Sequence, residues 1–486
     1  MKTYTSIPLT AELIAEWVGG ELILAGGGET QPIWSVCTDS REIESGGLFC
    51  AIRGERVDGH SYIPTAWTAG CACVLCEQVP EGLDGCYIRV EDTVAALSRL
   101  AAGVRDTYLS ELSVTAVTGS VGKTTVKELC AAVLREQVPT FCREGNYNSV
   151  IGMPLCVLGI GTEYRAAVLE MGMSARGEIS AMSRAARPTI AVITNVGSSH
   201  LAYLGTRENI ARAKLEILDG MHPGGHLVLC GDEPLLLQEL PPAYRDGTAG
   251  VTVHAVSAKD PSADFFLSDI RPTGEGAAFS LRLPSGAIWS DLYVPAHGVH
   301  MALDAAYAAA VGYLSGMGRE AVARGLGGYR AAHLRQETRR VGDVMLVLDC
   351  YNAAPESVRA ALDTLADLPA NGRRLALLGD MRELGTDSDS LHRAVGEYVA
   401  ARLDGLWTVG ASGAQIAAGA ADGGLPFVRA FAAEGGKADS EEVAATIAAA
   451  IAEALRPGDV LLIKASRALR LETVAERLTE ILKGQL

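Results

Sequence analysis

The stretch Ser113-Val114-Thr115-Ala116-Val117-Thr118-Gly119-Ser120-Val121-Gly122-Lys123-Thr124-Thr125 decides the fold class of this chain of 486 residues. Residues 112–118 alternate as a strand does, and residues 124–137 have the apolar spacing of a helix, so a glycine-containing turn joins a strand to a helix. Backbone N–H groups of such a turn bind phosphate, while Lys123 neutralises phosphate oxygens and the Thr124 hydroxyl holds Mg²⁺. The residues that we expect to contact nucleotide phosphates are Gly119, Ser120, Gly122, Lys123, Thr124 and Thr125.

The region that follows this turn has the pattern of a parallel sheet. Short apolar runs at residues 166–169, 189–194 and 226–230 are candidate buried strands, and helical patterns lie between several of them. Such alternation indicates a mainly parallel sheet covered by helices. Between residues 250 and 295 the pattern changes to short strands with Gly, Pro and Asp turns, which predicts an antiparallel appendage before a helix near Val299.

Length and pattern together predict an α/β protein of three domains. A domain has roughly 150 residues, so 486 residues suggest about three. We expect a small α/β domain at residues 1–90, a central P-loop domain at 91–333 and a Rossmann-like domain at 334–486. In the third domain no G-x-G-x-x-G follows the first strand, which predicts a ligand other than a dinucleotide. Its candidate strands are residues 344–348, 375–378, 406–409, 427–431 and 460–463.

Composition excludes several classes of protein. The chain has 58 acidic and 42 basic residues and a net charge of −16, so we expect no nucleic-acid partner. Hydrophobic residues make up 48% of the chain, which favours a folded protein. Because no apolar run reaches about 18 residues and the first residues lack the apolar segment of a signal peptide, we expect no membrane insertion and a cytoplasmic location.

The cysteines favour reduced thiols, because their number, 11, is odd and they are scattered over a long chain. Cys71, Cys73 and Cys76 form a cluster that would suit a metal ion or would equally belong to a buried strand. No clear Cys/His ligand pattern follows the cluster, so the buried strand is the favoured interpretation.

A second group of candidate functional residues follows two of the predicted strands. Glu170 ends one strand and His200 follows another. Ligands of open α/β sheets collect at the carboxyl ends of strands, so both side chains are expected near the phosphate loop, where a carboxylate and an imidazole suit a divalent metal. Lys214 lies on the helical run 210–217, and spacing alone predicts a solvated lysine there.

At this point the chain resembles the Mur ligases, ATP-dependent amide-forming enzymes of peptidoglycan synthesis. The family's phosphate loop lacks the first glycine of the general pattern G-x4-G-K-[ST], where this chain has Val117. The loops Asp39-Ser40-Arg41, 47–49 and Asp58-Gly59-His60 are similar to the family's UDP-binding N-terminal domain. Three further motifs are most similar to the branch that adds D-alanyl-D-alanine: GNYNSVIGMP at 145–154, DCYNAAPES at 349–357 and GDMRELG at 379–385.

The resemblance implies roles for individual residues. Lys123, Glu170, His200 and Lys214 would form the catalytic set, with ATP and two Mg²⁺ ions as cofactors. Thr124, Glu170 and His200 would hold metal, and Lys214, carbamylated by CO₂ into an anion, would support the second Mg²⁺. Arg335 would touch the γ-phosphate and Asp349 the ribose. Asp304 and Asn352 would also bind ATP, and the residues implied in binding the other substrates are Ser40, Arg41, Asn146, Asn148, Lys464, Ser466 and Arg467.

The chain departs from the family at the expected adenine site. His300 is followed by Met301 and Asp304 where the family usually has asparagines, and Ser149 and Ala354 also replace residues that are usually Asn. An ionised Asp304 would accept a hydrogen bond from the adenine amino group but would not donate one to a ring nitrogen. These departures predict weaker ATP binding and leave the reaction type unchanged.

The implied reaction joins D-alanyl-D-alanine to the terminal carboxylate of UDP-N-acetylmuramoyl-tripeptide through an acyl phosphate, in a protein that we expect to be a monomer. Two alternatives remain at the level of the sequence. One is a sibling ligase that adds a single amino acid, against which the motifs at 349–357 and 379–385 argue. The other is a nucleotide-binding regulator without catalysis, against which the intact Lys123 and Lys214 argue.

Overall fold

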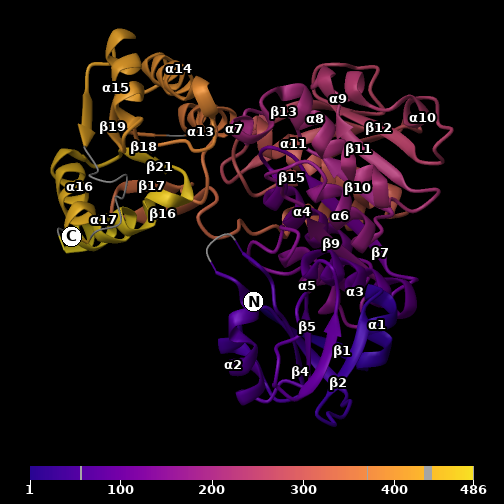
Figure 1. Cartoon of the computed structure of the whole chain (residues 1–486). Coiled ribbons are helices and arrows are strands. Elements are labelled where there is room, and N and C mark those ends of the chain that lie inside the picture. The colour runs from indigo at the N-terminus through magenta and orange to yellow at the C-terminus, as the bar shows by residue number, and fades with distance from the viewer. Residues whose placement is uncertain (55–56, 369, 432–440, 485–486) are drawn as a thin grey trace.

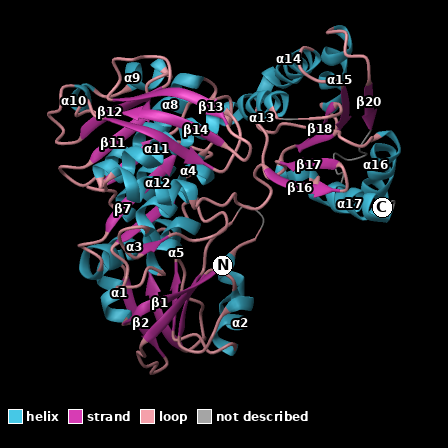
Figure 2. Cartoon of the chain, turned by 180° about the vertical axis from the view of Figure 1, so that it is seen from behind, coloured by secondary structure: helices cyan, strands magenta, loops and turns pink. Residues whose placement is uncertain are grey.

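The computed structural model describes residues 1–54, 57–368, 370–431 and 441–484. Three sheets organise the chain, with six, nine and six strands in order along the sequence. Figure 1 shows three groups of elements, one around each sheet, and Figure 2 shows the same arrangement from behind. The strands of the three sheets lie inside the three predicted domains, whose limits stay predictions.

The first sheet has the order β1-β3-β4-β5-β6-β2. Its four middle strands are parallel, while β1 and β2 close the two edges in antiparallel pairs. The cysteine cluster leads into buried strand β5, whose first and last residues are Cys73 and Cys76. The elements are β1 (Lys2–Leu9), α1 (Ala11–Val18), β2 (Glu21–Ala25), β3 (Ile33–Cys37), the 3-10 helix η1 (Ser40–Glu42), β4 (Gly47–Cys50), η2 (Gly59–Tyr62), α2 (Ile63–Thr68), β5 (Cys73–Cys76) and β6 (Gly85–Arg89).

The second sheet has the order β15-β14-β13-β12-β11-β10-β7-β9-β8. Neighbouring strands from β8 to β13 are parallel, and only β13-β14 and β14-β15 are antiparallel pairs. The strands are β7 (Ser113–Thr118), β8 (Thr140–Phe141), β9 (Ala166–Glu170), β10 (Ile190–Ile193), β11 (His226–Cys230), β12 (Thr252–Ser257), β13 (Phe265–Pro272), β14 (Ala277–Arg282) and β15 (Ile288–Val294).

The predicted antiparallel appendage at 250–295 is therefore only partly right. Thr252 pairs in parallel with His226, and Phe265 pairs in parallel with Val256, so β12 and β13 continue the parallel sheet. The edge of β11 offers unpaired backbone groups, and these short strands satisfy them before the chain turns into the antiparallel pairs. The helices of this domain are α3 (Thr93–Tyr108), α4 (Lys123–Arg135), α5 (Gly152–Leu158), α6 (Glu178–Ala186), α7 (Leu201–Leu204), α8 (Arg207–Leu215), the 3-10 helix η3 (Glu216–Gly220), α9 (Pro234–Glu239), α10 (Pro242–Arg245), α11 (Val299–Leu314) and α12 (Arg319–Gly327).

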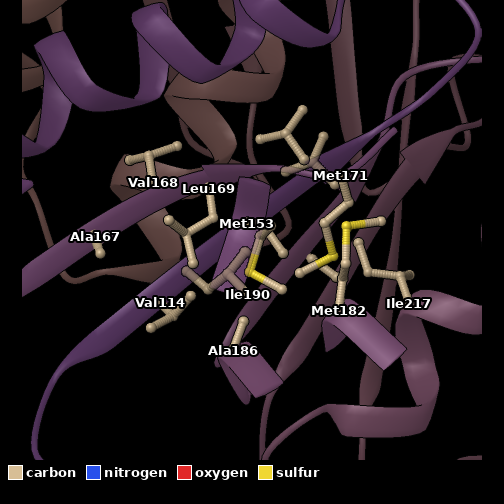
Figure 3. Packing of buried hydrophobic residues seen from close by; sticks show 14 of the residues in the cluster. Val114, Met153, Ala167, Val168, Leu169, Met171, Met182, Ala186, Ile190 and Ile217 are labelled. Atoms are coloured by element: carbon tan, nitrogen blue, oxygen red, sulfur yellow. The ribbon is translucent and has the colours of Figure 1, made fainter. Parts of the chain in front are cut away.

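One continuous hydrophobic core runs through the first two domains. It extends from Leu9 in β1 to Tyr329 beyond α12. Figure 3 shows a part of it, where Met153, Met171 and Met182 gather beside the sheet residues Val114 and Ile190. Helix α5 packs against both β1 and α3, which links the first sheet to the second. The two domains thus share apolar packing that would have to be exposed if they separated.

The third sheet has the order β16-β17-β21-β18-β19-β20, and all its pairs are parallel except β16-β17. Alternate residues of the strands belong to two separate hydrophobic clusters, one on each face of the sheet. Helices therefore cover both faces of this sheet. The elements are β16 (Glu337–Val341), β17 (Val344–Leu348), α13 (Pro355–Asp367), β18 (Arg374–Gly379), the 3-10 helix η4 (Gly385–Asp387), α14 (Ser388–Ala400), β19 (Gly405–Val409), α15 (Gly413–Asp422), β20 (Val428–Phe431), α16 (Glu441–Ala454), β21 (Val460–Lys464), η6 (Arg467–Leu469) and α17 (Glu472–Gly484).

Polar contacts join the third domain to the second. Oε1 of Glu356 in α13 accepts hydrogen bonds from N and Oγ of Ser198, at 2.9 and 2.7 Å. Nε2 of Gln336 lies 2.6 Å from Nε2 of His300 at the start of α11. Within the described ranges, no helix has both the length and the apolar character needed to cross a membrane.

Candidate active site

The phosphate loop has the predicted strand, turn and helix. β7 ends at Thr118 and α4 begins at Lys123. Gly122 has φ +84°, which a residue with a side chain rarely adopts, and a Cβ at Gly119 would collide with the hydroxyl of Thr194. Nζ of Lys123 donates to the carbonyl oxygens of Gly119 and Ser120, at 2.9 and 3.3 Å, so its ammonium group is folded over the loop.

Glu170 lies beside Thr124, a residue in the first turn of α4. Its Oε2 accepts a hydrogen bond from the Thr124 hydroxyl at 2.7 Å, and its Oε1 accepts one from Nδ2 of Asn148 at 2.7 Å. The carboxylate is only 8% exposed and sits at the last residue of β9. A buried carboxylate beside a threonine hydroxyl is the oxygen donor set that Mg²⁺ prefers, so these residues fit the implied metal.

Asn195 also holds the loop, a role that the sequence did not reveal. Its Oδ1 accepts from the backbone N–H of Val121 at 3.0 Å, while its Nδ2 donates to the Val121 carbonyl at 3.0 Å. Ser120 Oγ accepts from the N–H of Gly197 at 2.8 Å. The position of Asn195 directly after a strand is the one signal that would have indicated it.

The loop forms one wall of a cavity of about 260 Å³ between the second and third domains. The opposite wall comes from the third domain, where Nζ of Lys464 lies 2.6 Å from Oδ2 of Asp349. The structure thus brings together most of the residues predicted to bind ATP, and places the predicted substrate residue Lys464 among them. The predicted residues that line this cavity are Ser120, Gly122, Lys123, Thr124, Thr125, Asp304, Arg335, Asp349, Asn352 and Lys464.

Asp304 lies in surroundings that disfavour its ionised form. Asp304 is buried in α11, and a Cβ added at Gly122 would lie 3.0 Å from its Oδ1, so the carboxyl group faces the phosphate loop. Burial raises the pKa of Asp304 well above its usual value, which favours the protonated form of the group. A protonated carboxyl offers one donor and one acceptor, as an amide does. In its protonated form, Asp304 therefore has the hydrogen-bonding capacity of the asparagine that the family usually has here.

Other groups near the expected adenine site are also uncharged. Met301 lines the cavity and is 4% exposed. Burial lowers the pKa of His300 to about 4, so its imidazole is neutral at neutral pH.

Arg335 occupies the joint between the second and third domains. Its neighbours Leu334 and Gln336 have φ values of +60° and +52°, in the left-handed region that residues other than glycine rarely adopt. The guanidinium of Arg335 lies 4.4 Å from the centre of the Tyr351 ring. Arg335 also lines a second cavity, of about 550 Å³, which contains the predicted substrate residue Asn146.

Lys214 is buried, so the solvated lysine predicted from spacing alone is wrong. It lies in the last turn of α8 and is 1% exposed. Burial, aided by the charge of Lys123, lowers the pKa of Lys214 well below its usual value. A neutral amine is the form that reacts with CO₂, so the environment fits the implied carbamate.

His200 lies at the interface with the third domain. Its Nδ1 is 2.6 Å from Oε2 of Glu383. Burial lowers the pKa of Lys123 and the charge of Arg335 lowers it further, while the charges of Glu170 and Glu383 raise it. Glu383 was part of a quoted motif but was not predicted as a site residue.

The remaining predicted substrate residues lie apart from the two cavities. In η1, Arg41 is exposed and pairs with Asp39, beside Ser40. In the third domain, Oγ of Ser466 accepts from the N–H of Arg382 at 3.0 Å, and the guanidinium of Arg467 lies 5.8 Å from the centre of the Tyr351 ring.

Fold and site together define a three-domain nucleotide-binding protein with a phosphate loop, and comparison with known families agrees. Residues 32–105 match the model described as "Mur ligase family, catalytic domain", residues 117–312 match "Mur ligase middle domain", and residues 334–467 match "Mur ligase, glutamate ligase domain". The chain belongs to the Mur ligase family.

Individual relatives and solved structures are similar to this chain over nearly its whole length. The UDP-N-acetylmuramoyl-tripeptide–D-alanyl-D-alanine ligase of Bacillus subtilis is 37% identical over 98% of this chain and 99% of its own length. A crystal structure of MurF from Acinetobacter baumannii has a TM-score of 0.85 and 28% identity, covering 98% of this chain and 100% of that one. MurF ligase from Thermotoga maritima in complex with ADP has a TM-score of 0.80 and 27% identity, covering 93% and 98%.

Proposed function

We propose that this chain is an ATP-dependent ligase that joins D-alanyl-D-alanine to the terminal carboxylate of UDP-N-acetylmuramoyl-tripeptide, a step of peptidoglycan precursor synthesis. The observation that carries the proposal is the cavity walled by the phosphate loop on one side and by Asp349 and Lys464 on the other. Such a cavity holds a nucleotide between two domains. The similarity to tripeptide ligases over nearly the whole chain supplies the identity of the two other substrates.

ATP would bind across this cavity. The N–H groups of the loop and the ammonium of Lys123 receive the phosphates, which requires Lys123 to leave the carbonyl oxygens of Gly119 and Ser120. Asp349 would hold the ribose, with Asn352 beside it, while the neutral carboxyl of Asp304 lies on the wall near Gly122. Binding therefore exchanges contacts within the loop for contacts with phosphate.

Mg²⁺ would be held by Thr124, Glu170 and His200, with a second ion supported by Lys214 once carbamylated. The ions would neutralise charge on the transferring phosphate. Because Thr124 and Asn148 already bond Glu170, the carboxylate is oriented before any ligand arrives. Arg335 adds a further positive charge from the joint, so the loop and the joint converge on the γ-phosphate.

The reaction would have two steps. The tripeptide carboxylate attacks the γ-phosphorus of ATP, which forms an acyl phosphate and releases ADP. The amine of D-alanyl-D-alanine then attacks the acyl carbon, loses a proton and displaces inorganic phosphate. Two anions meet in the first step, so Lys123 and Arg335 act by electrostatic stabilisation.

The carbamate at Lys214 is a separate part of the proposal. A buried neutral lysine would add CO₂, lose one proton and become an anion at a place where a cation is disfavoured by burial and by Lys123. Lys214→Ala would then be nearly inactive and partly restored by short-chain carboxylates that occupy the same space. Unchanged activity of Lys214→Ala would contradict this role.

The substrates other than ATP would meet three further regions. Ser40 and Arg41 would bind the UDP part, Asn146 faces the second cavity next to Arg335, and Asn148 orients Glu170. Lys464, Ser466 and Arg467 would contact the incoming dipeptide. A single chain supplies all these groups, so we propose a monomer, and the need for ATP fits a cytoplasmic location.

The test is phosphate release by the purified chain with ATP and Mg²⁺. We expect release only when UDP-N-acetylmuramoyl-tripeptide and D-alanyl-D-alanine are both present, with the joined product seen by mass spectrometry. Tripeptides that end in diaminopimelate or lysine identify the third residue. Release with a single amino acid in place of the dipeptide would indicate a sibling ligase, and nucleotide binding without release would indicate a regulator.

A further inference from the structure

The GDMRELG motif at 379–385 reaches from the third domain to the start of α7 in the second, where its Glu383 meets His200. Nδ1 of His200 lies 2.6 Å from Oε2 of Glu383, and within the described residues this buried nitrogen makes no hydrogen bond, so the Glu383 carboxylate is the group that it faces. Because Nδ1 faces a carboxylate, Nε2 is the ring nitrogen that remains for a ligand. Imidazoles that bind metal commonly donate their other N–H to a carboxylate, which fixes the tautomer and the ring orientation.

The backbone fixes the position of Glu383 against His200. The N–H of Ala202 donates to the carbonyl oxygen of Glu383 at 3.2 Å. A Cβ at Gly385 would lie only 3.2 Å from Cα of Ala202, so the motif approaches α7 more closely than a side chain there would allow. These two backbone contacts therefore hold the carboxylate of Glu383 next to His200.

Both partners adopt a backbone conformation that is unfavourable for their residue type. His200 has φ +68° and Glu383 has φ +66°. Left-handed conformations of residues other than glycine persist where surrounding contacts impose them, and they gather at functional sites. Two such residues in contact across a domain interface indicate that the arrangement is maintained for a purpose beyond packing.

The same motif connects His200 to the proposed dipeptide region. Oδ1 of Asp380 accepts from the N–H groups of Ser412 and Gly413, at 2.9 and 3.0 Å, which anchors the start of the motif at α15. Arg382 N–H donates to Oγ of Ser466 at 3.0 Å. A displacement of the 464–467 stretch would thus be passed along the motif to Glu383.

We infer that Glu383 is a positioning residue for His200, which makes binding of a divalent cation by the second domain dependent on the docked third domain. This inference rests on the proposed role of His200 as a metal ligand. Glu383 orients the imidazole and holds its proton at Nδ1, and it does not touch the cation itself. When the third domain moves away, His200 loses its partner and the cation site weakens.

The test uses Mn²⁺ as a spectroscopic probe for Mg²⁺, bound to the full chain in the presence of ADP. Glu383→Ala removes the partner of Nδ1, while Glu383→Gln keeps an oxygen that can accept the N–H. We expect Glu383→Ala to weaken Mn²⁺ binding by about 10- to 100-fold. We also expect it to abolish the imidazole nitrogen coupling in the pulsed electron paramagnetic resonance spectrum of bound Mn²⁺, and Glu383→Gln to retain part of both.

Glu356→Ala is the matched control, since Glu356 crosses the same interface but contacts Ser198 and not His200. This variant loosens the same interface but keeps the carboxylate of Glu383, so it should weaken Mn²⁺ binding less than Glu383→Ala does and retain the nitrogen coupling in the bound Mn²⁺. The inference is overturned if Glu383→Ala binds Mn²⁺ as tightly as the natural chain or more tightly, if Glu356→Ala weakens binding as much, or if the natural chain shows no nitrogen coupling that His200→Ala removes. Ligase activity of the natural chain is measured separately, so failure of the proposed function would be recognised independently.

Discussion

The two joints of this molecule differ in chemistry. Between the first and second domains the contact is a continuous apolar core, into which α5 and α3 are packed with β1. Between the second and third domains the contacts are carboxylates and amides, such as Glu356 with Ser198 and Gln336 with His300. Apolar surface is costly to expose, whereas polar groups exchange partners with water at small net cost. We therefore expect the first joint to stay closed and the second to move.

The backbone at residues 334–336, which links the second and third domains, agrees with this difference between the joints. Leu334 belongs to the core of the third domain and is 2% exposed, while Arg335 beside it faces the nucleotide cavity. The left-handed conformations of Leu334 and Gln336 each cost on the order of 1–3 kcal/mol. If Arg335 binds phosphate as proposed, this strained linker would couple the domain arrangement to the nucleotide.

The largest effect is expected from breaking the apolar joint. Leu155 is fully buried in α5, so Leu155→Ala should destabilise the first two domains together by about 2–5 kcal/mol, because it leaves a cavity in their shared core. Differential scanning calorimetry measures the shift, with Leu155→Met as the control of similar volume. Separate melting of the first and second domains in the natural chain would contradict a shared core.

The next largest effect is expected from Lys123, which begins α4 and lines the cavity between the second and third domains. Lys123→Ala should lower turnover by roughly 100- to 1,000-fold, since the lysine stabilises charge in the transition state and contributes little to packing. Phosphate release measures the loss, and circular dichroism should show an unchanged fold. Near-normal turnover of the variant would show that the loop is not a catalytic phosphate site.

A smaller effect is expected from the polar joint. Glu356→Ala removes a carboxylate that accepts two hydrogen bonds from Ser198, so docking should weaken by about 1.5–3 kcal/mol while both sides keep their melting temperatures. Small-angle X-ray scattering detects the displaced third domain. A melting temperature lowered as strongly as in Leu155→Ala would mean that the second joint is as integral to folding as the first.

The smallest effect concerns Asp304 on the cavity wall. At neutral pH Asp304→Asn should change ATP affinity by no more than one neutral hydrogen bond, about 0.5–1.5 kcal/mol, because the protonated carboxyl and the amide offer the same groups. As the pH rises through the raised pKa of Asp304, the carboxyl ionises, loses its donor and places a negative charge beside the phosphate loop. Affinity of the natural chain should then fall.

Calorimetric titration of ATP across pH checks this, with Asp304→Asn as the variant that does not titrate. The neighbouring Tyr307 and Tyr329 stay neutral over the same range, since burial raises the pKa of each. Parallel pH profiles for the natural chain and the variant would show that Asp304 is not near the nucleotide.

The features that depend on residues close together in the sequence were predicted. The phosphate loop, the strand that ends at Glu170, the loop that carries His200 and most strands of the third domain follow from spacing within a few residues. Strand β16 was missed because its charged residues, such as Arg339 and Arg340, give no apolar pattern at an edge position. The burial of Lys214 and Asp304 was not predicted, because it depends on elements that are distant in the chain. The contact between Glu383 and His200 was not predicted for the same reason.

The most direct test of two unlike joints is small-angle scattering of the chain before and after addition of a non-hydrolysable ATP analogue and UDP-N-acetylmuramoyl-tripeptide. The account predicts a smaller radius of gyration with ligands, fitted by moving the third domain against a rigid body made of the first two. An unchanged scattering curve, or one that requires motion between the first and second domains, would contradict it.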